Sequence, residues 1–375
     1  MRSLVKPLIG VVALAAMAVT GCGANGGGGG DSKQIRLYAD GDVNVQSLWK
    51  DNLIPGFEKA NPGYTVKMTF DEHGQNSTTE LQKLAAAVKT KRDFGFDLLD
   101  SGIVSSAVSG NLLAKPDPGK LPNLVGVNQD LLSAVKNMAV PYRGTAVALA
   151  YNTEHVKTPP KTLDDLLAWI KAHPGKFTYN SPNSGGSGGA FVTTVVDHYV
   201  PEAARQKMTL DYDKADEKYW KKGLSTLKDL KPSIYQHVYP NGNQAVLDLL
   251  AKDSIWMCPA WIDQTLTAQQ AGDMPKSIAL TQISDPSFTG GGSYLGIPKT
   301  TKRSEAANKL INYVLGVDAQ AQIVKVMSGF PVIDLSKLPK SAQGKFEGLS
   351  NKFFRPGYQS NVNNDLNAQW QSDVA

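Results

Sequence analysis

An α/β fold of two lobes is predicted by three features of the sequence. Short apolar or alternating segments, typical of strands, are followed by segments with helical periodicity, and this order recurs along the chain. Strands that alternate with helices of about 10–15 residues indicate βαβ units and a largely parallel sheet. The chain is longer than one domain of about 100–200 residues, and no linker divides its folded part. Two α/β lobes that share one continuous chain satisfy all three features.

The first half of the chain contains four predicted strands. They lie over residues 34–39, 64–70, 96–100 and 145–152. Helices with one apolar face are predicted between the earlier strands, around residues 48–57 and 81–88. The segment TAVALAYN (145–152) is too apolar to be buried on one face alone, so we expect it in the middle of a sheet.

The same alternation continues in the second half. Thr162 and Asp165 form a capping pair for a helix that Pro174-Gly175 ends. A strand over 176–179 is followed by a Gly/Ser loop and a helix over 190–199. Further helices are predicted over 219–230, 243–252, 304–315 and 318–327, with apolar strands over 255–257 and 294–297. Residues from 336 onward are polar and weakly periodic, and they predict a last helical layer.

The N-terminal segment is typical of a secretory signal peptide. Arg2 and Lys6 form a positive head, and the apolar core over 8–19 is too short for a membrane-spanning helix of about 20 residues. Cys22 directly after a small residue resembles the lipobox of bacterial lipoproteins, in which that cysteine is acylated. We therefore expect a signal peptide over 1–21, lipidation of Cys22, a Gly-rich tether over 22–33, and a body exported to the cell envelope. An ordinary signal peptide that happens to contain a cysteine is the alternative.

Composition excludes several classes of protein. Hydrophobic residues make up 41% and charged residues 19%, which is typical of a globular chain with a core. The chain has 39 basic and 34 acidic residues, and removal of Arg2 and Lys6 leaves 37 − 34 = +3, without the basic blocks typical of nucleic-acid binders. With Cys22 lipidated, Cys258 stands alone, so no internal disulfide is available.

Several segments, in sequence order, resemble the bacterial extracellular solute-binding proteins of ABC importers, among them the family 1 proteins and their polyamine-, thiamine- and ferric-ion-binding relatives. The most telling segment is VPYRGTAVALAYN (140–152), since the family runs from a "P-aromatic" loop into a strand that ends in "YN" before the chain changes lobe. The other segments are LWKDNLIPGFEKANPGYTVKMT (48–69), FDLLDSG (96–102), PPKTLDDLLAWI (159–170), residues 241–261, GSYLGIPK (292–299) and residues 304–332.

The resemblance implies a two-lobed, periplasmic-binding-protein-like fold of type II, with a ligand cleft between lobes. Lobe 1 is expected over 34–151 and 287–335, lobe 2 over 152–286, and a C-terminal helical layer over 336–375. The resemblance also implies that the protein is a monomer without enzymatic activity. Such a protein closes on a small solute and delivers it to the transmembrane subunits of an ABC permease. No cofactor, metal or nucleic acid is expected.

Sites in such sheets lie outside the carboxyl ends of the strands. This rule nominates the loops 40–44, 101–102, 141–144, 181–189, 259–263 and 290–294. The candidate ligand-binding residues in these loops are Asp40, Gly41, Asp42, Ser101, Tyr142, Arg143, Ser184, Ser187, Gly188, Trp261, Asp263 and Tyr294.

Each candidate has a chemical role and a structural alternative. The glycines of the loop 181–189 allow backbone N–H groups at a helix start to bind a phosphate, phosphonate or carboxylate, unless the loop is a surface connection. Arg143 suits the same anion and is otherwise a solvated surface residue. The aromatic candidates suit a ring or a cation and are otherwise core residues, and the aspartates suit ammonium or hydroxyl groups and are otherwise turn residues.

We expect a small organic ligand with an anionic group, and a sugar or a polyamine remains an alternative. The segment Gly291-Gly292-Ser293 lacks the acidic residue that would help to hold a diamine.

Two other functions are considered. Residues 185–189 (GGSGG) satisfy G-x-S-x-G, so an exported serine hydrolase using Ser187 is one alternative, although the elbow is displaced from its strand and the later histidines come too early. A structural surface lipoprotein is the other. A calcium loop that opens as Asp40-x-Asp42-x-Asn44 is not completed, because Val45 replaces the turn glycine.

Overall fold

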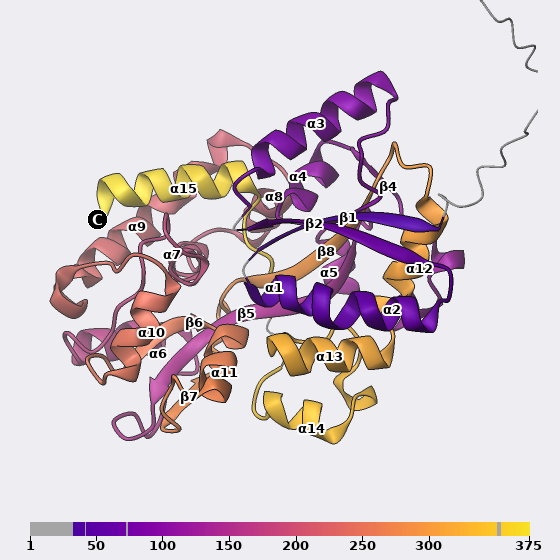
Figure 1. Cartoon of the computed structure of the whole chain (residues 1–375). Coiled ribbons are helices and arrows are strands. Elements are labelled where there is room, and N and C mark those ends of the chain that lie inside the picture. The colour runs from indigo at the N-terminus through magenta and orange to yellow at the C-terminus, as the bar shows by residue number, and fades with distance from the viewer. Residues whose placement is uncertain (1–32, 42, 73, 351–353) are drawn as a thin grey trace, which may run out of the picture.

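The computed structural model describes residues 33–41, 43–72, 74–350 and 354–375, which form two α/β halves (Figure 1). The predicted signal peptide, Cys22 and Asp42 lie outside these residues. Eight strands form one sheet, with the order β2-β1-β3-β8-β5-β6, while β4 pairs with β8 and β7 with β5. In the described residues no helix is both long and apolar enough to cross a membrane.

The first half is built on a parallel ladder. β1 pairs in parallel with β2 and β3, in a register that sets Gln34 opposite Thr65 and Ala39 opposite Asp100. These strands are β1 (Gln34–Gly41), β2 (Thr65–Glu72) and β3 (Leu98–Asp100). The helices are α1 (Val43–Ser47), α2 (Ile54–Ala60), α3 (Ser77–Thr90), α4 (Ile103–Ser109) and α5 (Gln129–Ser133), with a π-helical turn over Leu48–Leu53.

Two long strands connect the halves. The first part of β5 (Val140–Asn152) pairs antiparallel with β8 (Gly290–Pro298). The second part of β5 pairs antiparallel with β6 (Met257–Trp261) and β7 (Ile278–Thr281) in the other half. The short β4 (Leu113–Ala114) also pairs antiparallel with β8. β5 and β8 run in opposite directions because the chain leaves the first half along one and returns along the other.

The second half surrounds β6 and β7 with helices. They are α6 (Leu163–Ala172), α7 (Gly186–Asp197), α8 (Glu202–Leu210), α9 (Lys221–Leu230), α10 (Asn243–Ala251) and α11 (Ile262–Ala271). The predicted cap of α6 is confirmed, because the Thr162 side chain accepts a hydrogen bond from the backbone N–H of Asp165. The predicted strand over 176–179 is wrong: only Phe177 forms isolated bridges, to Ile234 and Met257.

The chain returns to the first half and ends on the second. α12 (Ser304–Val314), α13 (Val317–Met327) and α14 (Lys340–Gln343) follow β8, and α15 (Ser360–Asp373) ends the chain. Phe346 packs in the core of the first half, whereas Leu366 and Trp370 of α15 pack in that of the second. The segment predicted as one C-terminal layer is thus divided between the halves. Short 3-10 turns lie over Pro118–Lys120, Pro122–Gly126, Lys214–Trp220, Lys231–Ser233, Tyr235–His237, Leu335–Lys337 and Gly344–Phe346.

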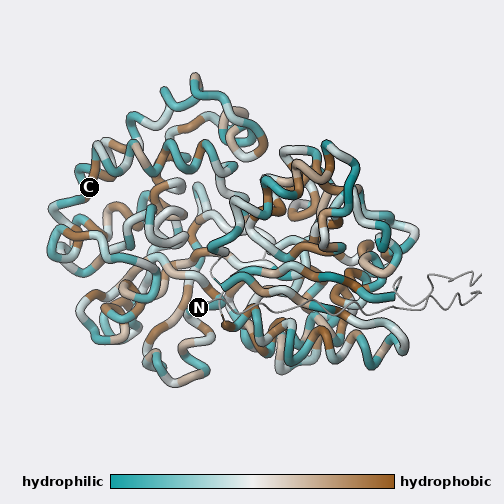
Figure 2. Tube along the Cα trace, turned by 45° about the horizontal axis from the view of Figure 1, so that its top comes forward, coloured by the Kyte–Doolittle hydropathy of each residue, from teal (hydrophilic) through white to brown (hydrophobic). Residues whose placement is uncertain are grey.

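Separate apolar cores lie on the two sides of the connecting strands. Trp49, Phe57 and Tyr142 belong to the core of the first half, and Phe191 and Trp220 to that of the second. Figure 2 shows the hydrophobic residues along the central strands and inner turns, with hydrophilic residues prominent on the outer turns. Because most of the apolar surface of each half is buried within that half, the two can keep most of their internal packing when their relative orientation changes, with Ile262 of α11 as a contact that reaches the first core.

Candidate ligand-binding site

The two halves meet along the first part of β5. Arg143 and Thr145 are two residues apart on this strand, so their side chains point to the same face of the sheet. Both are half-buried, whereas Tyr142 and Ala146, which flank the pair in the sequence, are buried in the first core. Arg143 and Thr145 therefore form a polar pair at the junction of the two halves.

A cavity of about 750 Å³ opens at Thr145 and is lined by residues of both halves. Asn44 and Met327 come from the first half, and Asn243, Trp261 and Asp263 from the second, with Thr145 on the connecting strand. Its volume lies within the range of about 300–1,000 Å³ that is typical of small-molecule sites. This arrangement is suited to a ligand that both halves contact at once.

Asp263 is the acidic group of this cavity. It lies in the first turn of α11, directly after Trp261, and its Oδ1 accepts a hydrogen bond of 2.6 Å from the Thr145 hydroxyl. Burial raises the pKa of Asp263, and the Thr145 hydrogen bond and the positive charge of Arg143 offset only part of this rise. A hydrogen-bond donor or a cation that reaches this carboxylate therefore stabilises its charged form.

Arg143 is held in place by a chain of buried groups. Its Nε donates to the Tyr142 hydroxyl at 2.9 Å, and that hydroxyl donates to Asp100 Oδ2 at 2.7 Å. The Trp49 Nε1 also donates to Asp100 Oδ2, at 2.6 Å. Burial raises the pKa of Asp100, although the positive charge of Arg143 and these two hydrogen bonds act in the opposite direction. In the described part of the chain no carboxylate lies within 4.0 Å of the Arg143 guanidinium.

Three of the predicted residues meet at the carboxyl end of β1. The Asp40 carboxylate accepts hydrogen bonds from the hydroxyls of Ser101 and Ser77 and, at 3.3 Å, from the backbone N–H of Gly102. Gly41 has a φ of +139°, where a Cβ would lie 2.9 Å from a Val45 methyl group. Asp40, Gly41 and Ser101 thus join the ends of β1 and β3 at the edge of the first half.

The glycine loop does not form the predicted open anion cradle. The backbone N–H of Ser187 donates to Asn243 Oδ1 at 3.1 Å, and that of Gly188 donates to Asn180 Oδ1 at 2.9 Å. Ser187 is 1% exposed. The side chains of Asn180 and Asn243 thus accept the hydrogen bonds that we predicted for a ligand. Ser187 and Gly188 are both buried. The exposed residue of this helix start is Gly186, where a Cβ would lie 2.7 Å from the Trp261 ring.

The same contacts argue against a hydrolase. The Ser187 hydroxyl lies 2.8 Å from Asn180 Oδ1 and 2.9 Å from Asn243 Oδ1, and both partners are amides that cannot act as a general base. Among the described residues, no group of three or more His, Cys, Asp or Glu side chains is arranged to hold a metal ion.

The remaining candidates, Ser184, Tyr142 and Tyr294, lie in three different environments. The Ser184 hydroxyl donates to the Ser181 carbonyl and accepts from the Gly242 N–H, both at 2.9 Å, so it fastens the loop. Tyr142 is fully buried and supports Arg143 from below, so the prediction that it contacts a ligand directly is corrected. Tyr294 lines a second hollow of about 520 Å³ on the other side of the junction, and burial raises its pKa to about 12.

Sequence reasoning missed Thr145 and Asn243. Thr145 follows Arg143 by two residues on a strand, and this spacing indicates a shared face. Asn243 was recognised only as the start of a helix, and nothing near it in the sequence indicates its contact with residue 187, 56 positions earlier.

Comparisons with known proteins agree with this architecture. The spermidine/putrescine-binding periplasmic protein of Escherichia coli K12 is 23% identical over 337 residues, which cover 87% of this chain and 85% of that protein. An extracellular solute-binding protein of Bordetella parapertussis has the same fold, with a TM-score of 0.72 at 16% identity, over 92% of this chain and 99% of the other. The spermidine/putrescine substrate-binding protein of Streptococcus pneumoniae gives a TM-score of 0.64 at 14% identity, over 91% and 99%.

The predicted two-lobed, periplasmic-binding-protein-like fold is therefore confirmed, and the two halves are called lobe 1 and lobe 2 below. Residues 52–346 match the family model described as bacterial extracellular solute-binding protein. The match covers well over half of the chain and agrees with the resemblance found in its segments. This chain belongs to the family of bacterial extracellular solute-binding proteins.

Proposed function

We propose that this protein is the lipid-anchored, extracytoplasmic solute-binding component of an ABC importer. It captures a small organic solute between its lobes and delivers it to the transmembrane subunits of the permease. The observation that carries the proposal is the cavity at the junction, because residues of both lobes line it around the strand that connects them. A ligand that contacts both lobes stabilises the closed arrangement by its differential affinity for that state.

The ligand that suits this cleft carries an anionic group together with a polar or ammonium group. Arg143 presents its guanidinium without a carboxylate partner among the described residues, which favours a carboxylate, phosphate or phosphonate at this point. Asp263 lies on the opposite lobe, where it suits a hydroxyl or ammonium group, and the Trp261 ring supplies a flat apolar contact. A cation at the centre of the junction disfavours a simple diamine.

The anchor fits the same function. An acylated Cys22 would keep the binder close to its permease and raise its effective concentration there. One acyl chain binds a membrane only marginally, so a second chain or a second attraction is needed for stable anchoring. We therefore place the protein in the periplasm or at the outer face of the cell membrane, as a monomer without enzymatic activity.

The experiment is a thermal-shift screen of the chain from residue 22 against amino acids, phosphonates, phosphate esters, polyamines and sugars. A true ligand at about 100 times its dissociation constant stabilises the fold by roughly 2.7 kcal/mol, which raises the melting temperature measurably. Arg143→Ala is expected to abolish the response to an anionic ligand, whereas Arg92→Ala, exposed in lobe 1 and away from the cavity lining, should leave it unchanged. A ligand without an anionic group, bound equally well by Arg143→Ala, would refute the assignment of Arg143.

A further inference from the structure

One end of lobe 1 carries more positive charge than the whole mature chain. The basic end consists of residues 33–36, 58–64, 91–97 and 299–309, at the amino ends of β1, β2 and β3. It contains nine basic and four acidic side chains, a net charge of +5. The chain without Arg2 and Lys6 has a net charge of +3, so the rest of the mature chain sums to −2. The charge of this protein is therefore strongly polarised.

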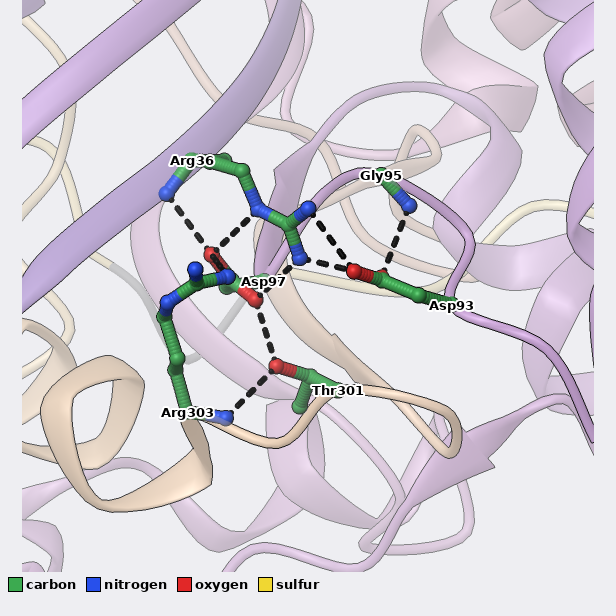
Figure 3. A network of polar contacts seen from close by, with 6 residues as sticks. All are labelled: Arg36, Asp93, Gly95, Asp97, Thr301 and Arg303. Atoms are coloured by element: carbon green, nitrogen blue, oxygen red, sulfur yellow. Dashed lines mark hydrogen bonds and ion pairs between the residues drawn. The ribbon is translucent and has the colours of Figure 1, made fainter. Parts of the chain in front are cut away.

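Contacts between these four segments show that they are neighbours. Gln34 pairs with Thr65 at the start of the parallel ladder, and the backbone N–H of Asp97 donates to the Arg36 carbonyl. The Thr301 hydroxyl donates to Asp97 at 2.6 Å, which brings the segment before α12 to the same place (Figure 3). The Nζ atoms of Lys33 and Lys309 each lie 5.5 Å from the centre of the Tyr64 ring.

Three of the four acidic groups of the basic end, Asp93, Asp97 and Glu58, accept hydrogen bonds from neighbouring residues, whereas Glu305 is exposed. Arg36 forms hydrogen bonds to both Asp93 and Asp97, and Arg303 lies 3.6 Å from Asp97 (Figure 3). Glu58 accepts a hydrogen bond of 2.8 Å from the backbone N–H of Val66. The exposed cations are in contrast without ion pairs among the described residues; they are Lys33, Lys59, Lys91, Arg92, Lys299, Lys302 and Lys309. The positive charge therefore faces outward.

We propose that the basic end is a docking surface for the anionic lipid headgroups of the membrane that carries the protein. Lysine side chains are compact point charges that suit lipid phosphates, and each cation near an anionic surface strengthens binding roughly five-fold. A lipid chain combined with a polybasic patch is a known physical route to stable membrane attachment.

The position of the basic end agrees with this role. With the proposed lipidation of Cys22, Lys33 lies eleven positions after the anchored residue, and a fully extended chain spans at most roughly 40 Å over this length. β1 begins at the basic end, and the chain reaches Asn44, which lines the cavity, shortly after the other end of this strand. A lobe 1 that rests on the membrane by its basic end leaves the cleft and lobe 2 free to move.

The test uses the mature chain from residue 22 with Cys22→Ser, so that no acyl chain contributes. Binding is measured by co-sedimentation with vesicles of phosphatidylcholine alone and of phosphatidylcholine with 30% phosphatidylglycerol. We expect binding only to the anionic vesicles, with a loss at high salt because a Debye length of about 3 Å at 1 M screens the attraction. The variant Arg92→Glu/Lys302→Glu/Lys309→Glu should bind at least about a hundred-fold more weakly.

The control Lys171→Glu/Lys228→Glu/Lys252→Glu makes the same charge change at exposed positions on lobe 2 and should keep most of the binding. Equal losses in the two variants would overturn the assignment of the surface, and equal binding of the unchanged protein to both kinds of vesicle would overturn the proposal itself. Solute binding, measured on the same samples by thermal shift, is expected to be unchanged in both variants. A failure of vesicle binding is thereby distinguished from a failure of the proposed transport function.

Discussion

In the proposed function, ligand selection depends on Arg143, and the position of this side chain is set by buried neighbours. Tyr142 lies between the guanidinium and the buried Asp100 carboxylate, and its hydroxyl contacts both. Such a chain of hydrogen bonds fixes a rotamer that a solvated arginine would sample only part of the time. The affinity of the cleft for an anion should therefore depend on a residue buried in the core of lobe 1.

Tyr142→Phe tests this dependence. The change removes one hydroxyl, which leaves the Arg143 Nε unpaired and the buried Asp100 carboxylate with Trp49 as its remaining donor, so we expect a loss of about 1–3 kcal/mol in the free energy of unfolding. We also expect weaker binding of the anionic ligand, measured by calorimetry alongside urea unfolding. Tyr313→Phe is the control, because the Tyr313 hydroxyl has no hydrogen bond to the described residues. Similar effects of the two changes would contradict the role of Tyr142.

The helix start at residues 185–188 depends on an asparagine in the same way. Asn180 is fully buried; its Oδ1 accepts from the Gly188 N–H and contacts the Ser187 hydroxyl, while its Nδ2 donates to the carbonyls of Ser181 and Gly185. Asn180→Ala leaves several buried polar groups unpaired, so we expect a loss of about 2–4 kcal/mol in chemical unfolding. Asn183→Ala, an exposed position in the same loop, should cost less than about 0.5 kcal/mol. A small cost at Asn180 would indicate that these amides are open to a ligand after all.

At the scale of elements, the ladder β2-β1-β3 is joined to the start of α12 by a charged network. Burial alone would raise the pKa of Asp97, but its hydrogen bonds from Arg36 and Thr301 outweigh this effect and hold the pKa below its usual value. A carboxylate whose pKa is lowered on folding contributes stability above its unfolded pKa of about 3.9, and this contribution is lost as the pH falls through its folded pKa. The network should therefore make lobe 1 sensitive to acid.

Asp97→Asn and Asp93→Asn form a matched pair for this element, because both carboxylates contact Arg36 (Figure 3). The Asp97 side chain is 0% exposed and that of Asp93 is 44% exposed. We expect a loss of about 3 kcal/mol at pH 7 for Asp97→Asn and less than about 1 kcal/mol for Asp93→Asn. The fall in unfolding free energy between pH 5 and pH 3 should also become shallower in Asp97→Asn. An unchanged slope would contradict the pH argument.

The elements of this fold were largely predictable because their signals are local. The parallel strands β1 and β2 follow from alternation over 34–39 and 64–70, and the cap of α6 follows from two residues three positions apart. The segment 176–179 has strand composition, but whether it joins a ladder depends on neighbours at residues 234 and 257. Pairings over such distances leave no signal in one sequence.

The candidate site was predictable only in part for the same reason. Arg143 and Asp263 were chosen because they lie in loops next to predicted strands, and the structure brings both to the junction of the lobes. The glycine loop was interpreted by its composition, which shows that its amides can turn inward but not what accepts their hydrogen bonds. Here Asn180 and Asn243 accept them.

At the scale of the whole molecule, the lobes are connected but not locked together. Apart from the connecting strands, Lys136 of lobe 1 and Asp211 of lobe 2 lie 3.7 Å apart as an exposed ion pair, which contributes little to stability. Most of each core lies within its own lobe, although Ile262 of α11 packs in the core of lobe 1. A ligand that contacts both lobes can therefore shift the population toward the closed state.

Small-angle X-ray scattering with and without a solute identified by thermal shift is the most direct test of this account. We expect the radius of gyration to fall on saturation with the solute, because the lobes close on it. The solute should produce no such change in Arg143→Ala, which keeps the fold but loses the central contact. An unchanged radius of gyration at saturating solute would contradict capture of the solute between the two lobes.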